Sequence, residues 1–394
     1  MRRFFAAALA AALLLLTLSA CAPAEKEEDP QKEPPVTEEP EIIVPDPEPT
    51  PEELAAAEIE DLLASMTTEE KVGQLFFVRC PESGAVEDIS TYHLGGYLLF
   101  GRDFQDKTAD DVIQTIRAYQ SAAEADTGIA LLIGVDEEGG TVVRVSSNPH
   151  LRGSKFQSPQ KLLAAGGTEA LVADAADKDA LLKALGINVN LAPVADVSTD
   201  PADFIYDRTC GLDAAGTADC VAAVVGQMAA DGMGSVLKHF PGYGNNVDTH
   251  TGIAVDQRSL ESFRQSDFLP FAAGIDAGDG TAAVLVSHNI LTAVDDSLPA
   301  SLSPAVHDLL RTELSFPGVA MTDDLAMDAV AAYSEDGAVA VMALQAGNDL
   351  IITTDYRTQI PKVIEAVENG TVSMETVDTA CRRVLEWKQS LGLL

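Results

Sequence analysis

The chain has 394 residues, of which 62 are acidic and 25 are basic, giving a formal net charge of −37. This excess of negative charge argues against nucleic-acid binding and against docking on anionic lipid, because both would repel the protein. Much of the excess lies in one segment near the N-terminus, and the remainder is typical of a solvated acidic surface.

The N-terminus has the order of a secretion signal. Two arginines precede an apolar run from Phe4 to Leu18, and small residues with a cysteine follow it. The run is too short to span a bilayer comfortably, so we predict a signal peptide over residues 1–20.

Leu18-Ser19-Ala20-Cys21 resembles the bacterial lipobox. The resemblance implies cleavage before Cys21 and a lipid on its sulfur. That lipid would hold the protein on the outer face of the cytoplasmic membrane, so we expect an extracytoplasmic, lipid-anchored location. An ordinary signal peptide with Cys21 as a bystander is the alternative.

Residues 22 to about 51 consist almost entirely of Pro, Glu, Asp, Lys and Thr. Such a segment cannot bury enough apolar surface to offset ordering entropy, and its prolines and repelling carboxylates keep it extended. We therefore predict the lipidated Cys21 and a disordered acidic linker over residues 21–53, followed by one folded domain over residues 54–394.

The folded part alternates short apolar runs with longer stretches of helical spacing, as expected for βα units around a buried parallel sheet. Thr67 and Glu70 form a capping-box pattern ahead of the first run. Eight apolar runs are candidate strands, and eight parallel strands close a barrel. We predict an α/β fold, a single (β/α)8 TIM-type barrel. The candidate strands are Gln74–Val78, Tyr97–Phe100, Ala130–Val135, Val189–Ala192, Val236–Leu237, Ala283–Val286, Val319–Met321 and Asp349–Ile352, and the candidate helices include Ala109–Ala125, Glu169–Leu185, Thr217–Asp231, Pro304–Leu314 and Gly337–Gln345.

Polar residues follow most of these strands at their C-terminal ends, where such barrels build their active sites. A doubly wound sheet would also collect ligand groups at strand ends, but it normally carries a Gly-rich phosphate turn that this chain lacks. The polar segments are Gly101-Arg102-Asp103, Asp136-Glu137-Glu138, Asp196, Lys238-His239, Ser287-His288-Asn289 and Asp323-Asp324.

Two adjacent carboxylates, Asp323 and Asp324, end the seventh candidate strand. One could act as a nucleophile with the other as its support. Either could equally cap the helix-like segment Leu325–Ala332, which needs no catalysis.

A Gly- and Asn-rich loop after the fifth strand carries Asp248 and His250. Residues two apart in an extended segment lie on the same side, so Asp248 could orient His250 and stabilise its imidazolium. A surface turn without a role is the alternative. Arg144 and Arg208 could recognise hydroxyl or carbonyl groups, or form structural ion pairs.

The cysteines after Cys21 are too far apart for a Cys-x-x-Cys metal or redox site. An extracytoplasmic location permits a disulfide, yet isolated cysteines in strands and helices are more often buried free thiols. We expect no metal and no cofactor. The four cysteines are Cys80, Cys210, Cys220 and Cys381.

These motifs together resemble family 3 glycoside hydrolases, and within them the β-N-acetylglucosaminidase branch that acts on cell-wall fragments. The similarity covers about Met66 to Leu391. Its most specific part is the stretch from Lys238 to Gly244 with the downstream Asp248-Thr249-His250, which separates this branch from family 3 β-glucosidases. The other matching segments are Gly73–Phe77, Gly134–Gly140, Asn190–Val197, Asp207-Arg208, Thr322–Leu325 and Ala346–Asp349.

The resemblance implies a role for each of several residues. Asp323 corresponds to the nucleophile, and Asp248 with His250 corresponds to the acid/base dyad. His288 matches a histidine near the site. The positions that contact the N-acetylglucosamine ring are matched by Asp136, Arg144, Arg208, Lys238 and His239.

The sequence departs from the family's pattern at three places. Tyr243 replaces a histidine, Glu137 and Thr141 replace a common Gln and Arg, and Thr209-Cys210 replaces Ser-Phe. The positions of the nucleophile and the dyad are all filled, so the expectation of catalysis stands.

The implied activity is that of a retaining exo-β-N-acetylglucosaminidase, a β-N-acetylhexosaminidase that hydrolyses terminal β-linked N-acetylglucosamine from peptidoglycan fragments through a glycosyl-Asp intermediate. A neutral imidazole avoids like-charge repulsion with Asp323 and needs an orienting carboxylate, which explains the Asp248–His250 pair. The expected partners are an amino-sugar glycan or muropeptide, and the membrane through the lipid on Cys21. A phosphorylase of the same family and a non-catalytic muropeptide-binding lipoprotein are the alternatives.

Overall fold

The computed structural model describes residues 49–246, 254–331, 333 and 338–394. Residues Pro49–Leu394 form one compact unit. Its first helix, α1 (Pro51–Ser65), begins just before the predicted domain boundary, because Thr50 and Glu53 form a capping box there. The predicted signal peptide, Cys21 and most of the predicted linker lie outside the described residues. Within the described ranges, none of the helices has the length and apolar character needed to cross a membrane.

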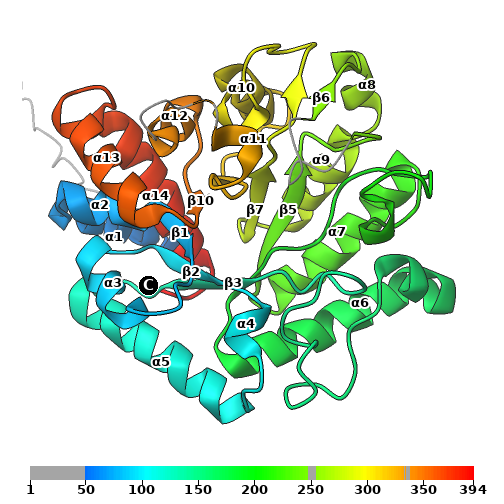
Figure 1. Cartoon of the computed structure of the whole chain (residues 1–394), viewed down its shortest axis with the longest axis horizontal. Helices are drawn as coiled ribbons and strands as arrows, with labels where there is room; N and C mark the ends of the chain where they lie inside the picture. Colours follow the sequence, from blue (N-terminus) through cyan, green and yellow to red (C-terminus); the bar gives the residue numbers. More distant parts are fainter. Residues whose placement is uncertain (1–48, 247–253, 332, 334–337) are drawn as a thin grey trace, which may run out of the picture. The chain divides into compact units, whose positions relative to one another are not determined.

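Eight parallel strands form the barrel (Figure 1). Their order around the sheet is β10-β1-β2-β3-β4-β5-β7-β9. A parallel bridge from Met321 to Leu350 joins β9 to the residue before β10 and closes the ring. The predicted (β/α)8 fold is confirmed. The barrel strands are β1 (Phe76–Arg79), β2 (Gly96–Leu99), β3 (Leu132–Val135), β4 (Val189–Asn190), β5 (Gly234–Phe240), β7 (Ala282–Val286), β9 (Ala320–Thr322) and β10 (Ile351–Thr353).

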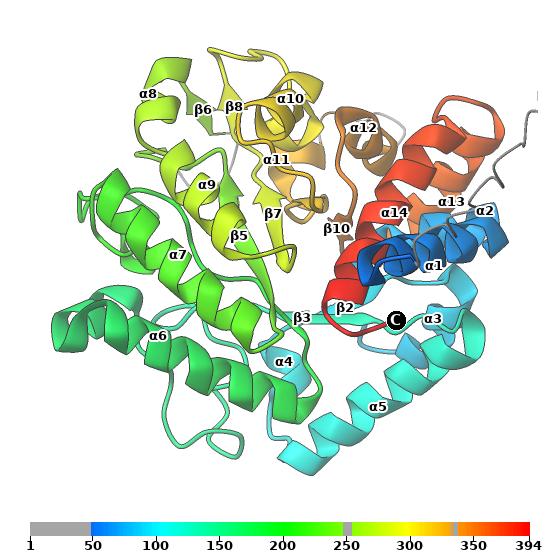
Figure 2. The same ribbon diagram turned by 180° about the vertical axis from the view of Figure 1, so that it is seen from behind.

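Helices surround the barrel and cover the outer faces of the strands (Figures 1 and 2). The capping box predicted at Thr67 and Glu70 is present at the start of α2: the Glu70 N–H donates to Thr67 Oγ1 at 3.2 Å, and the Thr67 N–H donates to Glu70 Oε2 at 2.7 Å. The helices after α1 are α2 (Thr68–Gln74), α3 (Ala85–Tyr92), α4 (Gly101–Phe104), α5 (Ala109–Asp126), α6 (Pro159–Leu185), α7 (Ala214–Ala230), α8 (Leu260–Gln265), α9 (Phe268–Ala277), α10 (Pro304–Thr312), α11 (Asp328–Ala331), α12 (Val339–Ala346), α13 (Tyr356–Glu368) and α14 (Met374–Ser390), with 3-10 turns at Tyr206–Arg208 and Ala300–Leu302.

Each predicted strand overlaps an observed one, but β5 is longer than the predicted Val236–Leu237. All residues of β5 are buried, including Lys238 and His239. We predicted that this strand ends at Leu237, because Lys238 and His239 are polar. In the folded chain, carboxylates at the mouth of the barrel pair with both of these side chains. The small sheet formed by β6 (Val255–Asp256) and β8 (Ile290–Leu291) was not predicted, because strands of two residues leave no periodic pattern.

Phe77 fills the barrel interior next to β2 and β3. A Cβ atom at Gly134 would lie 2.3 Å from Phe77 Cζ, and one at Gly96 would lie 2.8 Å from Phe77 Cδ2. Glycine at both positions therefore leaves room for the ring. Phe77 lies two residues before Arg79, so this apolar layer packs below the polar strand ends and closes the bottom of the site.

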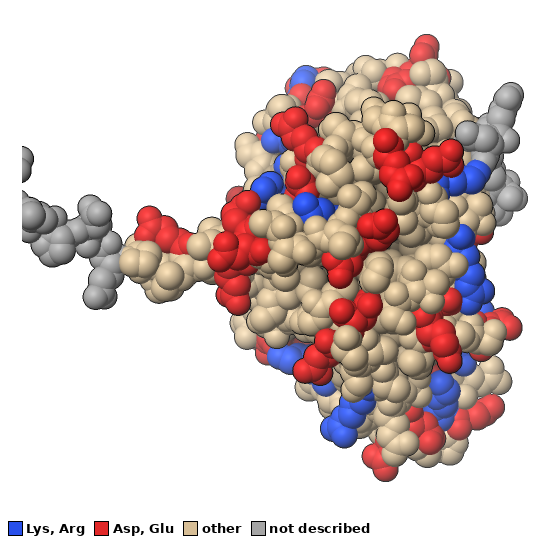
Figure 3. Space-filling view, turned by 90° about the vertical axis from the view of Figure 1, so that its left-hand side faces the viewer, with Lys and Arg blue, Asp and Glu red and all other residues tan. Residues whose placement is uncertain are grey.

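On the face of the folded unit shown in Figure 3, acidic side chains are spread out, with Lys and Arg between them. Many form pairs at the surface, such as Arg264 with Glu313 at 2.6 Å. This distribution fits the expectation of a solvated acidic surface.

Candidate active site

A pocket of about 310 Å³ opens among the C-terminal ends of the strands. Arg79 is the last residue of β1, while Phe100, Asp136 and Asp323 follow β2, β3 and β9. This is the end of the barrel at which such folds carry their active sites. Six of the predicted site residues line the pocket: Asp136, Arg144, Arg208, Lys238, His239 and Asp323.

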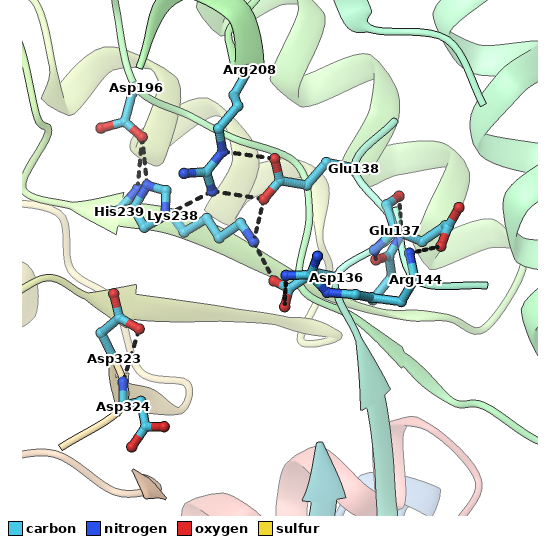
Figure 4. Close-up of polar contacts among 11 residues, drawn as sticks. Asp136, Glu137, Glu138, Arg144, Asp196, Arg208, Lys238, His239, Asp323 and Asp324 are labelled. Atoms are coloured by element: carbon cyan, nitrogen blue, oxygen red, sulfur yellow. Dashed lines mark hydrogen bonds and ion pairs between the residues drawn. The ribbon is translucent and has the colours of Figure 1, made fainter. Parts of the chain in front are cut away.

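A network of alternating charges forms one wall of the pocket (Figure 4). Lys238 Nζ lies 2.7 Å from Asp136 Oδ1 and 2.6 Å from Glu138 Oε1. Arg208 donates to the same Glu138 carboxylate from Nε at 2.9 Å and from Nη2 at 2.8 Å. Each cation therefore has a carboxylate partner, which a charge buried this deeply requires.

Burial alone would raise the pKa of Glu138, but Lys238 and Arg208 outweigh it and hold the pKa well below its usual range. Glu138 is thus a permanent anion at neutral pH. It fixes the two cations in place, so that their remaining donors and the Asp136 carboxylate can be presented to sugar hydroxyls.

The proton position on His239 follows from its two partners. Nδ1 lies 2.8 Å from Asp196 Oδ2, and Nε2 lies 3.2 Å from Arg208 Nη2. Because an arginine only donates hydrogen bonds, Nε2 accepts and Nδ1–H donates to Asp196. Asp196 therefore sets the tautomer and the ring orientation of His239.

Tyr243, which stands where the family has a histidine, is buried against this group. Its N–H donates to Asp196 Oδ1 at 2.7 Å. Its ring packs edge-on to His239, with centroids 5.0 Å apart, and contacts Phe204 at 5.9 Å. The Tyr243 ring thus packs against the imidazole ring of His239.

The two adjacent carboxylates after β9 point in different directions (Figure 4). Asp324 accepts from the Ala326 N–H at 2.9 Å and from Thr354 Oγ1–H at 2.7 Å, so it holds the turn after the strand. Asp323 Oδ1 accepts from the Asp324 N–H at 2.8 Å, and its carboxylate points toward the Lys238–His239 strand. Asp324 therefore makes the structural contacts that are expected of a helix-capping residue.

His288 is buried behind the pocket and is not among its lining residues. Its Nε2 lies 3.2 Å from the carbonyl oxygen of Asp324, and its Nδ1 lies 2.7 Å from Ser301 Oγ. Nε2–H donates to the carbonyl, so His288 supports the backbone that carries Asp323 rather than facing the pocket.

Asp248 and His250 lie outside the described residues. The chain on both sides of them is anchored: Asn246 Nδ2 donates to Asp256 Oδ2 at 2.6 Å, and Arg258 pairs with Asp256 at 2.8 Å and with Asp267 at 2.9 Å. Asn246 and Asp256, which flank the segment that carries the predicted dyad, therefore lie side by side, and Asn246 comes three residues after Tyr243.

Sequence reasoning did not assign site roles to Glu138, Asp196 or Glu137. Asp136 and Glu138 are two apart, so the alternation of side chains in extended backbone could have indicated that they face the same way. Glu137 faces the other way and accepts from the N–H groups of Arg144 at 2.8 Å and Val145 at 2.7 Å. It therefore fixes the loop that carries Arg144.

The four cysteines of the folded unit are buried free thiols. Cys210 and Cys220 pack in one small apolar cluster with Leu171. None of the four lines the pocket with Asp323.

The barrel and its strand-end pocket, which a carboxylate lines together with hydrogen-bonding groups, suit a glycoside hydrolase. Residues 67–387 match the family model described as "Glycosyl hydrolase family 3 N terminal domain". The chain belongs to glycosyl hydrolase family 3.

Relatives that are named for an enzymatic activity are similar to most of the chain. The chain is 30% identical to "Beta-hexosaminidase LpqI" of Mycobacterium tuberculosis over 85% of its own length and 86% of the relative. It is 29% identical to "Beta-hexosaminidase A" of Pseudoalteromonas piscicida, of which it spans only about half, 55%. The structure of a family 3 β-N-acetylglucosaminidase from Paenibacillus superposes with a TM-score of 0.77 at 31% identity, over 84% of this chain and 63% of that one.

Proposed function

We propose that this protein is a retaining exo-β-N-acetylglucosaminidase that removes terminal β-linked N-acetylglucosamine from peptidoglycan fragments. The observation that carries the proposal is the pocket that Asp323 lines together with Lys238, His239 and Arg208. The names of the relatives, β-hexosaminidase and β-N-acetylglucosaminidase, support the same substrate class.

Asp323 is the proposed nucleophile. Its carboxylate attacks the anomeric carbon, the bond to the leaving oxygen breaks, and a glycosyl ester forms on Asp323. Water then cleaves the ester and restores the carboxylate. The N–H of Asp324 at 2.8 Å orients the carboxylate, while Thr354 and Ala326 hold Asp324 itself out of the reaction.

His250 is the proposed acid/base, oriented by Asp248. As the imidazolium it protonates the leaving oxygen in the first step, and the neutral imidazole that remains takes a proton from water in the second. A neutral imidazole adds no negative charge beside Asp323, unlike the second carboxylate of most glycosidases. The anchored contact between Asn246 and Asp256 keeps both ends of the segment close to Tyr243, which packs on His239.

The charged wall is proposed to bind the sugar ring. Asp136 accepts hydrogen bonds from hydroxyl groups, whereas Lys238, Arg208 and His239 present donors or acceptors at fixed positions. Glu138 and Asp196 hold these groups from behind. Because the set is held rigidly before substrate arrives, little ordering entropy is lost on binding.

The proposed location is the outer face of the cytoplasmic membrane, through a lipid on Cys21. The order of the first residues and the acidic linker support it. Cys21→Ala should release the protein from the membrane fraction. A variant that stays as firmly bound as the native protein would contradict the lipid anchor without touching the catalytic proposal.

The activity is tested with two matched aryl glycosides that differ only at C2. We expect faster cleavage of the β-N-acetylglucosaminide than of the β-glucoside, and N-acetylglucosamine from a disaccharide of N-acetylglucosamine and N-acetylmuramic acid. Faster cleavage of the glucoside would overturn the assignment. Release of sugar 1-phosphate in phosphate buffer would identify a phosphorylase instead.

A further inference from the structure

One cationic side chain of the pocket takes no part in the network described above. Arg79 lines the pocket together with Phe100 and Arg144. Its guanidinium carbon lies 4.4 Å from the centroid of the Phe100 ring. Within the described part of the chain, Arg79 Nε is buried without a hydrogen-bond acceptor, and its side chain has no ion-pair partner.

Arg144 approaches the same ring, with its guanidinium carbon 5.5 Å from the centroid. Its Nε is likewise buried without an acceptor among the described residues. Its contact with a carboxylate is long, 3.6 Å to Asp136 Oδ2, and that carboxylate already binds Lys238 at 2.7 Å. Arg79, Phe100 and Arg144 therefore form a second wall, here called the arginine face.

The charges of the two walls are balanced differently. Lys238 and Arg208 share Asp136 and Glu138 at hydrogen-bonding distances. Asp103, a carboxylate near the arginine face, accepts from the Phe100 N–H at 2.7 Å and lies beside Arg102 at 3.7 Å. Counting only the described residues, the arginine face is thus left with positive charge and unfilled N–H donors, an arrangement that costs free energy until an acceptor binds.

We propose that the arginine face binds, through Arg79, a carboxylate on the leaving-group side of the substrate, while Arg144 keeps the contact with the N-acetylglucosamine ring that the sequence predicts. The planar guanidinium fork matches a carboxylate, and the Phe100 ring offers an apolar surface for the carbon atoms around it. This inference rests on the proposed function, since it concerns the group released from N-acetylglucosamine.

The terminal N-acetylglucosamine carries no anion, so the carboxylate must belong to the neighbouring sugar. In peptidoglycan fragments that have lost their peptide stem, that sugar is N-acetylmuramic acid, whose lactyl ether then ends in a free carboxylate. A chitin disaccharide has the same glycosidic bond and no carboxylate. The arginine face therefore selects cell-wall fragments over chitin fragments by charge.

The test compares three disaccharides: N-acetylglucosaminyl-N-acetylmuramic acid, its methyl ester, and di-N-acetylchitobiose. Arg79→Met should lower kcat/KM for the free acid by roughly 10- to 100-fold, because a charge-assisted hydrogen bond is lost. The same variant should change kcat/KM for the ester and for chitobiose by less than about twofold. Arg79→Lys, which keeps the charge but not the fork, should lie between the two.

Arg152 supplies a matched control, because its guanidinium also stacks on a phenylalanine, 3.9 Å from the Phe156 centroid, but does not line the pocket. Arg152→Met should leave the preference for the free acid unchanged. Equal losses on all three substrates in Arg79→Met would mean that Arg79 only supports Phe100, and would overturn the inference.

A binding measurement separates this inference from the proposed function. Calorimetry with Asp323→Asn, alone and combined with Arg79→Met, compares the affinities for the free acid and for the ester without turnover. Tighter binding of the acid that disappears in the double variant supports the arginine face, even if the native enzyme fails to cleave N-acetylglucosaminides. Equal affinities in Asp323→Asn overturn it, even if cleavage is normal.

Discussion

Arg208 and Glu138 form two parallel hydrogen bonds inside the barrel mouth, from Nε at 2.9 Å and from Nη2 at 2.8 Å. Lys238 shares the same carboxylate at 2.6 Å. One buried anion therefore fixes two of the cations that face the pocket, and the sugar-binding wall depends on a residue that does not line it.

Glu138→Gln should destabilise the protein by about 3–5 kcal/mol, because two buried cations lose their shared counter-ion while the side chain keeps its size. Urea unfolding at neutral pH measures this. The exposed pair Arg264–Glu313 provides the control, and Glu313→Gln should cost much less. Comparable losses in the two variants would contradict the view that Glu138 is a buried counter-ion.

The Glu138 pKa also predicts a pH dependence. Since the folded state holds this pKa below its usual value, the pair contributes stability above the unfolded pKa and loses it as the pH falls toward the folded one. The stability difference between the native protein and Glu138→Gln should therefore shrink below about pH 4.5, the ordinary glutamate value.

Lys388 predicts a second pH dependence, with the same sign but at higher pH. It is fully buried in α14, with Nζ 2.7 Å from Gln74 Oε1, and burial lowers its pKa to about 7 from an ordinary value of 10.5. Between these two values the unfolded chain holds a proton that the folded chain does not. The free energy of unfolding should therefore rise with pH across this window, whereas below it both states are protonated.

Lys388→Met should remove this contribution to the pH dependence of the free energy of unfolding. The variant should be most stable relative to the native protein below pH 7, and its advantage should shrink as the pH rises toward 10.5. Urea titrations at pH 6 and pH 9.5 provide the comparison. A stability difference that does not change between the two would mean that Lys388 stays protonated inside the fold.

The sequence predicted the barrel because apolar runs of strand length recur eight times with polar residues behind them. It also predicted six of the residues that line the pocket, since the strands of a parallel barrel all end on one side. It ended the fifth strand too early, because the burial of Lys238 depends on Asp136 and Glu138, which are distant in the chain. Pairings of that kind are set by tertiary structure and leave no local pattern.

The same limit applies to the roles within the site. Asp323 and Asp324 are equivalent in a linear pattern, and only the bonds of Asp324 to Ala326 and Thr354 separate them. No role was predicted for Arg79, because its lack of a carboxylate partner among the described residues becomes visible only when its neighbours in space are known. The roles of Asp248 and His250 stay predictions, since they lie outside the described residues.

Asp323→Asn should lower turnover of every substrate by at least roughly three orders of magnitude, because no glycosyl ester can form without the anionic nucleophile. Asp324→Asn should keep most of the activity, since it loses about one hydrogen bond, worth about 1 kcal/mol, at the Thr354 hydroxyl. Steady-state kinetics on an aryl N-acetylglucosaminide distinguish the two. A greater loss of activity in Asp324→Asn than in Asp323→Asn would mean that Asp324 is the nucleophile and Asp323 its structural support.

His250→Ala should separate the two steps of the reaction. A nitrophenolate leaves without being protonated, so formation of the glycosyl ester on Asp323 should survive with an aryl substrate. Hydrolysis of that ester needs a base to activate water, and its loss should let the intermediate accumulate. The measurable result is a burst of nitrophenolate followed by slow turnover, with the mass of one N-acetylglucosaminyl group added to the enzyme.

A natural disaccharide tests the other half of the same role. Its leaving alkoxide must be protonated, so His250→Ala should fail at the first step, with neither a burst nor an adduct. Asp248→Asn should show a milder form of both effects, because it removes the charge that stabilises the imidazolium but leaves the ring in place. Equal losses on aryl and natural substrates, with no adduct on either, would remove His250 from the acid/base role. The acid/base would then have to be sought among the carboxylates around the pocket, with Asp324, whose side chain lines it, tested before the loop-bound Glu137.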